Sequence, residues 1–85
     1  MTRIAKLYAW TLANPGAQIS FRDFQRLLTA FGFVELRQCG SHRCFRHPEC
    51  AQLLIIQPRG SDAKPYQVRA FVDMVRDCGL TLDDR

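Results

Sequence analysis

Apolar residues recur at intervals of three and four in three segments of the chain, and this spacing is typical of helices that bury one face. The first apolar stripe consists of Ile4, Leu7, Tyr8 and Leu12. An Asn-Pro-Gly sequence at residues 14–16 ends the pattern, because proline and glycine interrupt helices. We therefore expect a first helix over residues 2–13.

The second segment predicts a helix over residues 21–31. Ser20 is a suitable N-cap, Asp23 lies in the first turn where the helix dipole favours an acid, and Gly32 ends the helix. Ile19 is placed to staple the helix start by packing on Phe24. The stripe consists of Phe21, Phe24, Leu27, Leu28 and Phe31.

The third segment predicts a helix that begins at Pro65, a residue favoured in the first helical position. Gly79 and Leu80 are typical of a C-terminal cap with its hydrophobic contact. The stripe consists of Val68, Phe71, Val72, Val75 and Cys78.

Between the last two helices the apolar period changes to two, which predicts strands. Residues 34–39 and 43–47 alternate on either side of a Gly-Ser turn. A Pro-Glu turn precedes residues 52–57, whose Leu-Leu-Ile-Ile run is typical of a buried strand. Residues 58–64 are predicted to be a polar loop.

These elements predict an α+β fold in the order α-β-β-β-α with an extra N-terminal helix. Each of the two strong helices has a single apolar stripe, so both should cover one face of a three-stranded antiparallel sheet and leave the other open. This is the architecture of double-stranded-RNA-binding domains. We expect an N-terminal helical extension at residues 1–19, the domain itself at 20–80 and an acidic tail at 81–85.

Composition limits the class of protein. The 85 residues are 47% hydrophobic, which suits one small domain with a modest core. We expect a cytoplasmic protein, because there is neither a run of about 18 apolar residues to span a membrane nor a signal peptide. The net charge of +4 is the sum of +6 in the first 69 residues and −2 in the last sixteen. This distribution is typical of a protein that binds a polyanion such as nucleic acid. An equally good interpretation is that the charges only keep the surface solvated.

Four cysteines raise the questions of disulfides and of metal. Free thiols are the expectation, because nothing indicates export. A zinc site is the alternative, since Cys39, Cys44, His47 and Cys50 follow the pattern C-x4-C-x2-H-x2-C. This pattern lacks the usual C-x2-C pair, so we favour thiols that act as small apolar residues.

The candidate chemistry lies in residues 40–48, which read GSHRCFRHP. Histidine is the side chain whose ordinary pKa lets it accept and donate protons near neutrality, and His42 follows a tight turn. It is the candidate general acid or base. His47, next to Pro48, is expected to be structural or to lie near a phosphate.

Residues 20–80 resemble the HicA-type toxins of HicAB toxin-antitoxin modules. The resemblance lies in the order and spacing of several motifs. These are Phe-Gly-Phe at 31–33, Gly-Ser-His at 40–42, Phe-Arg-His-Pro at 45–48, Gln-Pro at 57–58 and Gly-Leu at 79–80.

The resemblance implies a cytoplasmic mRNA endoribonuclease that needs no metal or other cofactor and is inhibited by a HicB-type antitoxin. Any homo-oligomer would form through the antitoxin complex. The family's catalytic histidine corresponds to His42, and Gly40 and Ser41 form the turn that presents it. Many members have a second histidine where this chain has Arg43, so a mechanism with one histidine is expected.

RNA cleavage also requires cations that stabilise charge on the phosphate. The residues expected to contact RNA are Ser41, Arg43, Arg46, Arg59, Lys64, Tyr66 and Arg69. The alternative function is a non-catalytic RNA-binding module of the same fold.

Overall fold

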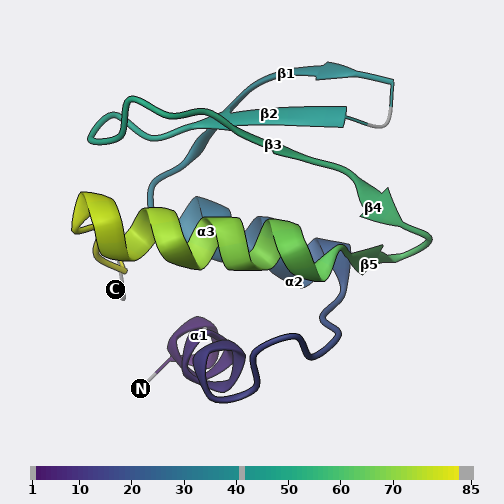
Figure 1. Ribbon diagram of the computed structural model, residues 1–85, viewed down its shortest axis with the longest axis vertical. Coiled ribbons are helices and arrows are strands. Elements are labelled where there is room, and N and C mark those ends of the chain that lie inside the picture. The colour runs from purple at the N-terminus through teal and green to yellow at the C-terminus, as the bar shows by residue number, and fades with distance from the viewer. Residues whose placement is uncertain (1, 41, 83–85) are drawn as a thin grey trace.

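The computed structural model describes residues 2–40 and 42–82, and it contains three helices and a three-stranded sheet (Figure 1). The helices are α1 (Arg3–Ala13), α2 (Phe21–Ala30) and α3 (Pro65–Cys78). The strands of the main sheet are β1 (Val34–Cys39), β2 (His42–Arg46) and β3 (Leu54–Ile56). Two very short strands, β4 (Pro58–Arg59) and β5 (Asp62–Ala63), form a separate hairpin.

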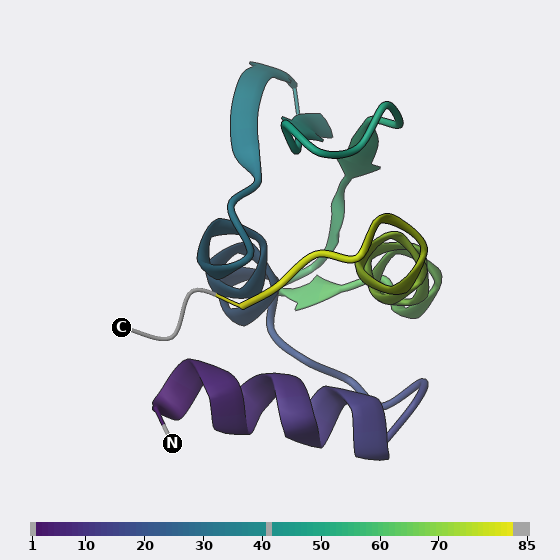
Figure 2. The same cartoon turned by 90° about the vertical axis from the view of Figure 1, so that its left-hand side faces the viewer.

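The elements lie in three layers. Figures 1 and 2 show the main sheet on one side, α2 and α3 side by side beneath it, and α1 beneath those two helices. The sheet is antiparallel in the order β1-β2-β3. This is the predicted α+β fold with a double-stranded-RNA-binding-domain-like arrangement, and it leaves one face of the sheet without a helix.

Local sequence signals account for the helix ends. The Ser20 side-chain oxygen accepts a hydrogen bond of 3.0 Å from the Asp23 backbone N–H, as an N-cap should. Thr2 caps α1 in the same way through the N–H of Ala5. Gly79 ends α3 with a φ of 65°, a left-handed conformation that glycine adopts without strain.

The core lies between the sheet and the two helices beneath it. Its fully buried side chains come from α2, α3 and β3. They are Phe24, Leu27, Leu28, Ile56 and Phe71. The Phe71 ring makes edge contacts with Phe24, Phe31 and Phe33, so one aromatic side chain of α3 connects α2 to the start of β1.

Helix α1 packs on this core from outside. The ring of Tyr8 lies 4.7 Å from that of Phe31 and 6.2 Å from that of Phe71, between ring centres. The loop after α1 is held by Gln18, whose side-chain amide donates to the Asp62 carboxylate on β5. The N-terminal segment is therefore an added packing layer.

Three details differ from the sequence-based expectations. The second strand covers His42–Arg46 and not residues 43–47, and the third covers Leu54–Ile56 and is thus shorter than predicted. Residues 58–64 are not a plain loop, because β4 and β5 form a hairpin there. This hairpin is joined to the start of α2 by the Phe21 N–H, which donates to the Ser61 carbonyl.

The expectation that all cysteines are free thiols is wrong. Cys50, in the turn after β2, forms a disulfide with Cys78 at the end of α3. The two residues lie 28 positions apart in sequence, but their Cα atoms are 5.9 Å apart. Spacing along the chain gave no sign of this proximity. Cys44 is a free thiol.

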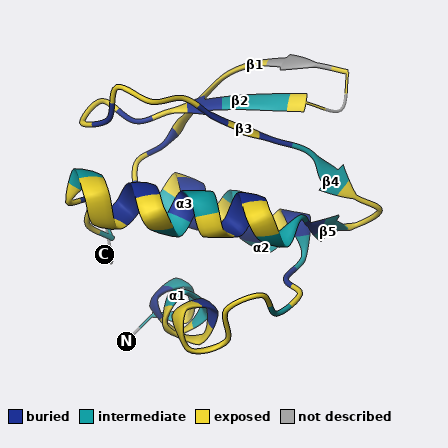
Figure 3. Ribbon diagram, viewed as in Figure 1, coloured by how far each residue is buried: buried dark blue, intermediate teal, exposed yellow. Residues whose placement is uncertain are grey.

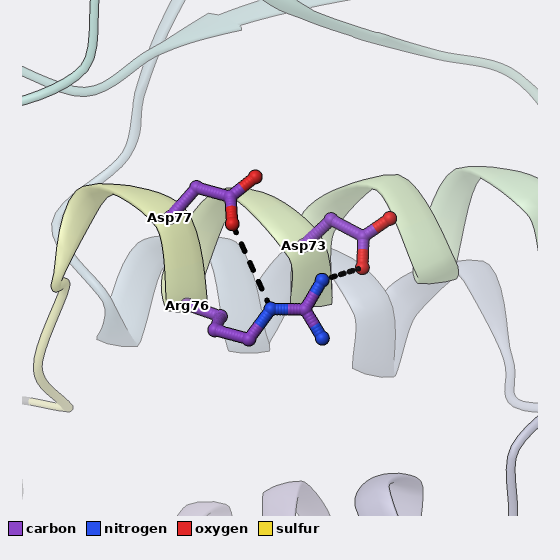
Figure 4. A network of polar contacts seen from close by, with 3 residues as sticks. All are labelled: Asp73, Arg76 and Asp77. Atoms are coloured by element: carbon purple, nitrogen blue, oxygen red, sulfur yellow. Dashed lines mark hydrogen bonds and ion pairs between the residues drawn. The ribbon is translucent and has the colours of Figure 1, made fainter.

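On the exposed side of α3, a basic side chain is paired with acidic side chains of the same helix. Figure 4 shows Arg76 between two aspartates, with its Nη2 atom 3.0 Å from Asp73 Oδ1 and its Nε atom 3.6 Å from Asp77 Oδ1. The basic side chain in this half of the helix is thus already paired with carboxylates. No helix in the part of the chain that the structure describes is long and apolar enough to cross a membrane.

Candidate functional site

The candidate catalytic residue, His42, is the first residue of β2 and is exposed. It pairs across the ladder with Cys39, and Gly40 in the connecting turn has a φ of 60°. Strand alternation places His42, Cys44 and Arg46 on one side of β2 and Arg43 and Phe45 on the other. Because Phe45 is buried against the helices, His42 lies on the open side of the sheet.

The second histidine has the opposite environment. His47 is buried, with its Nε2 atom 2.8 Å from the Phe31 carbonyl oxygen. Its Nδ1 atom accepts a hydrogen bond of 3.0 Å from the Glu49 N–H, so Nε2 is the donor to Phe31. Both ring nitrogens therefore join the end of α2 to the turn after β2, which is a structural role.

Arg43 does not lie beside His42. It points toward the helix layer, where its Nη1 atom is 3.6 Å from Glu35 Oε2 and its guanidinium carbon is 6.0 Å from the centre of the Phe21 ring. Arg43 thus connects β1, β2 and the start of α2. Although it follows His42 in sequence, the alternation of the strand separates the two side chains.

Several of the residues that are expected to contact RNA lie at the same end of the molecule as His42. Figure 1 shows the β1–β2 turn, the β4–β5 hairpin and the start of α3 at one end. This arrangement brings three of the predicted RNA contacts, Arg59, Lys64 and Tyr66, to the end where β2 begins. Arg59 and Tyr66 are exposed, and Lys64 is half-buried at the N-cap of α3.

Two glutamines hold this end of the molecule, and neither was expected from the sequence to do so. The buried Gln67 side chain accepts a hydrogen bond of 3.0 Å from the Gln57 N–H and donates to the Tyr66 hydroxyl at 3.3 Å. Lys64 Nζ donates to Gln57 Oε1 at 3.2 Å. A signal was present, because Gln67 is a polar residue beside the apolar stripe of α3.

The remaining predicted contacts are dispersed. Arg46 ends β2, four residues from His42 and on the same open face. Arg69 lines a groove between α3 and the end of α1, together with Trp10 and Asp73. Ser41 lies outside the described residues. The structure therefore places only part of the predicted set at the end of the molecule where His42 lies.

The four residues of the alternative zinc pattern do not form a set of free ligands. The Cys50 sulfur is bonded to Cys78, and both nitrogens of His47 are engaged with the backbone. Two of the four residues are thus committed to other bonds. Among the described residues, no group of three or more potential metal ligands occurs. The side chain of Cys39 lies outside the described part.

The chemistry available at this end follows from its groups. An exposed imidazole can accept and donate protons. The cations on the β4–β5 hairpin and at the start of α3 can bind phosphate, and the N-terminus of a helix adds the positive end of its dipole. Such a set suits a polyanionic ligand whose reaction requires proton transfer.

A three-stranded antiparallel sheet, backed by two helices and carrying an exposed histidine after its first hairpin turn, defines a small α+β protein of the double-stranded-RNA-binding-domain class. A family model described as the HicA toxin of bacterial toxin-antitoxin systems matches residues 21–80. The chain belongs to this toxin family, which implies an antitoxin partner. No curated protein and no solved structure matches the chain.

Proposed function

We propose that this toxin is a metal-independent endoribonuclease that cleaves mRNA with His42 as its catalytic residue. The observation that carries the proposal is the contrast between the two histidines. His47 is buried with both nitrogens bonded, whereas His42 is exposed beside the basic end of the molecule. Of the two, His42 is therefore the one that an RNA strand can reach.

The reaction needs only groups that RNA, this chain and solvent water supply. The 2′-hydroxyl of a ribose attacks the adjacent phosphorus, the bond to the 5′-oxygen breaks, and a 2′,3′-cyclic phosphate remains. His42 takes the proton from the 2′-hydroxyl or gives one to the leaving 5′-oxygen, a contribution of roughly 10²- to 10⁴-fold, and solvent water makes the other of these two proton transfers. Arg59 and Lys64 are the candidates that stabilise the extra negative charge on the phosphate.

The partner and the location are part of the same proposal. The antitoxin is of the HicB type and inhibits the enzyme in the cytoplasm, where mRNA is translated. Arrest of growth by mRNA cleavage would place the module in a stress response.

The test compares wild-type protein with His42→Ala during expression in bacteria and with purified RNA. Wild-type protein should arrest growth, degrade transcripts and cleave RNA in the presence of EDTA, leaving cyclic phosphate ends. His42→Ala, folded and equally abundant, should lose at least about 100-fold of the cleavage rate. Arg26→Ala, which changes an exposed cation on α2, is the matched control and should cleave like wild type.

Two results would contradict the proposal. Equal cleavage by wild-type protein and His42→Ala would exclude His42 as the catalytic group. RNA binding without cleavage by the wild-type protein would instead identify a non-catalytic RNA-binding module of this fold.

A further inference from the structure

The open face of the sheet is apolar where a solvent-facing surface is normally polar. Four large aliphatic side chains of the β1 and β3 region are about half exposed. They are Val34 at 56%, Leu36 at 51%, Leu53 at 47% and Ile55 at 55%. Single exposed apolar residues are ordinary, but neighbouring ones on one face are typical of an interaction site.

The ladder pairing shows that this surface is continuous. Val34 pairs with Arg46, and Ile55 pairs with Cys44, so both lie on the same side of the sheet as His42. Val34, Leu36, Arg46 and Pro48 also line one shallow hollow. Figure 3 shows the described part of β1 as exposed.

A β-bulge in β1 adds a basic side chain to this apolar face. The register of β1 shifts between Glu35 and Arg37, so that Arg37 pairs with Cys44 on the open side. In a regular strand, Leu36 and Arg37 would point to opposite faces. The bulge therefore places a cation next to the apolar hollow instead of in the helix-facing layer.

The charge on this face indicates which kind of partner can bind there. Arg37 and Arg46 are exposed, and neither forms an ion pair among residues 2–40 and 42–82. A second copy of the chain would bring the same arginines together. RNA is a poor match, because bases stack on aromatic rings and the apolar side chains of this face are aliphatic. A protein segment with a large apolar side chain beside carboxylates matches both features.

We propose that this open-face patch, formed by Val34, Leu36, Arg37, Arg46, Leu53 and Ile55, is the docking surface for an acidic segment of the antitoxin. The proposal rests on the toxin-antitoxin function and adds the surface and the chemistry of the partner segment. The hollow is four residues along β2 from His42, which is about 13 Å at the rise of a strand. The antitoxin is thus held by a surface beside the catalytic position, and not by the catalytic histidine itself.

The test measures binding of the purified antitoxin, identified as the protein that neutralises this toxin on co-expression, by calorimetry. All toxin variants carry His42→Ala, so that they can be produced without toxicity and the result does not depend on RNA cleavage. Leu36→Glu and Ile55→Glu should each weaken binding by at least about 30-fold, as expected at the centre of an interface. Arg46→Glu should weaken binding and reduce its dependence on salt.

Leu12→Glu is the matched control, because Leu12 is 49% exposed but lies on α1, away from the sheet. It should bind within about threefold of the parent, well below the loss at a central contact. Circular dichroism and thermal unfolding check that each variant is folded. Binding by Leu36→Glu and Ile55→Glu equal to that of the control would overturn the proposal. A toxin dimer that Ile55→Glu dissociates would do the same, because it would show that a second copy covers this face.

Discussion

His42 and His47 lie five positions apart in sequence, but their surroundings differ. This difference decides which of the two can react with a substrate. His42 begins β2 and lies exposed on the open face. His47 follows the strand and turns beneath it, where the Phe31 carbonyl and the Glu49 N–H hold its ring. A buried imidazole with both nitrogens bonded, such as that of His47, would lose these bonds on exchanging a proton with a substrate. The exposed ring of His42 does not have to break these bonds.

Gly32 is the residue that allows His47 to pack this closely. Its φ is 93°, and a Cβ atom added there would lie 3.1 Å from His47 Nε2. The N–H of the next residue, Phe33, donates to the Leu28 carbonyl and closes the end of α2. The conformation that ends the helix therefore also opens the space for the histidine ring.

Replacing Gly32 should consequently cost more than replacing a glycine of similar conformation with free space around it. Gly16 is the matched control, because its φ is 83° and nothing lies within 4 Å of an added Cβ. Gly16→Ala should lower the free energy of unfolding by about 1–2 kcal/mol through backbone strain alone. Gly32→Ala should lower it by a further 1 kcal/mol or so, because the hydrogen bond of His47 to Phe31 must weaken. Urea unfolding measures both values, and equal losses would contradict the role given to Gly32.

At the scale of elements, α1 is a layer added outside the residues that match the family. It is held through partly buried side chains, among which Tyr8 contacts the rings of Phe31 and Phe71. Burial raises the pKa of the Tyr8 hydroxyl above its ordinary value of 10.0, since the charged phenolate is poorly solvated there. The attachment of α1 is thus linked to the protonation of one side chain.

This link predicts a loss of stability in alkaline solution. Because the folded-state pKa of Tyr8 is the higher one, the unfolded chain releases the proton first as the pH rises past 10.0. The contribution of Tyr8 is complete below that pH and falls as the pH rises toward the folded-state pKa. Tyr8→Phe should therefore show a smaller alkaline decrease in the urea midpoint than wild type. Tyr66→Phe, which removes an exposed phenol, is the control, and an equal benefit from it would contradict the role of Tyr8.

The elements that could be predicted from sequence are those whose apolar pattern is long. The stripe of α2 and its Ser20 cap, and the stripe of α3 with Gly79, were sufficient to place both helices. The β4–β5 hairpin could not be predicted, because strands of two residues have no period. Alternation identified β1, but it could not show that Val34 and Leu36 face solvent, since the face of a strand depends on what packs against it.

For the candidate site, the structure bears on positions and not on roles. His42 is exposed after the turn, and its catalytic role stays a prediction, while the burial of His47 agrees with the structural role expected from its position before Pro48. The neighbours of His42 could not be inferred, because Arg43 is adjacent in sequence but points to the other face. Gln57 and Gln67 form their contacts only once β3 and α3 are packed.

For the molecule as a whole, the disulfide is the strongest connection between its layers. Cys50 lies between β2 and β3, and Cys78 ends α3, so the bond closes a loop that contains β3, the β4–β5 hairpin and α3. A cross-link stabilises a protein mainly by restricting its unfolded chain, and the effect grows with the length of the loop. For a sequence separation of 28, the chain-entropy relation gives about 3.6 kcal/mol.

Dithiothreitol should therefore lower the free energy of unfolding by about 3–4 kcal/mol, a large part of the 5–15 kcal/mol typical of small domains. The variant with Cys50→Ala and Cys78→Ala should show a similar loss and no further response to dithiothreitol. Cys44→Ala, which removes a free thiol, should respond like wild type. An unchanged urea midpoint on reduction of the wild-type protein would contradict the stabilising role of the bond. In a reducing environment, where most thiols stay reduced, the protein should therefore have the lower stability, and binding of the antitoxin to the folded form would offset part of that loss.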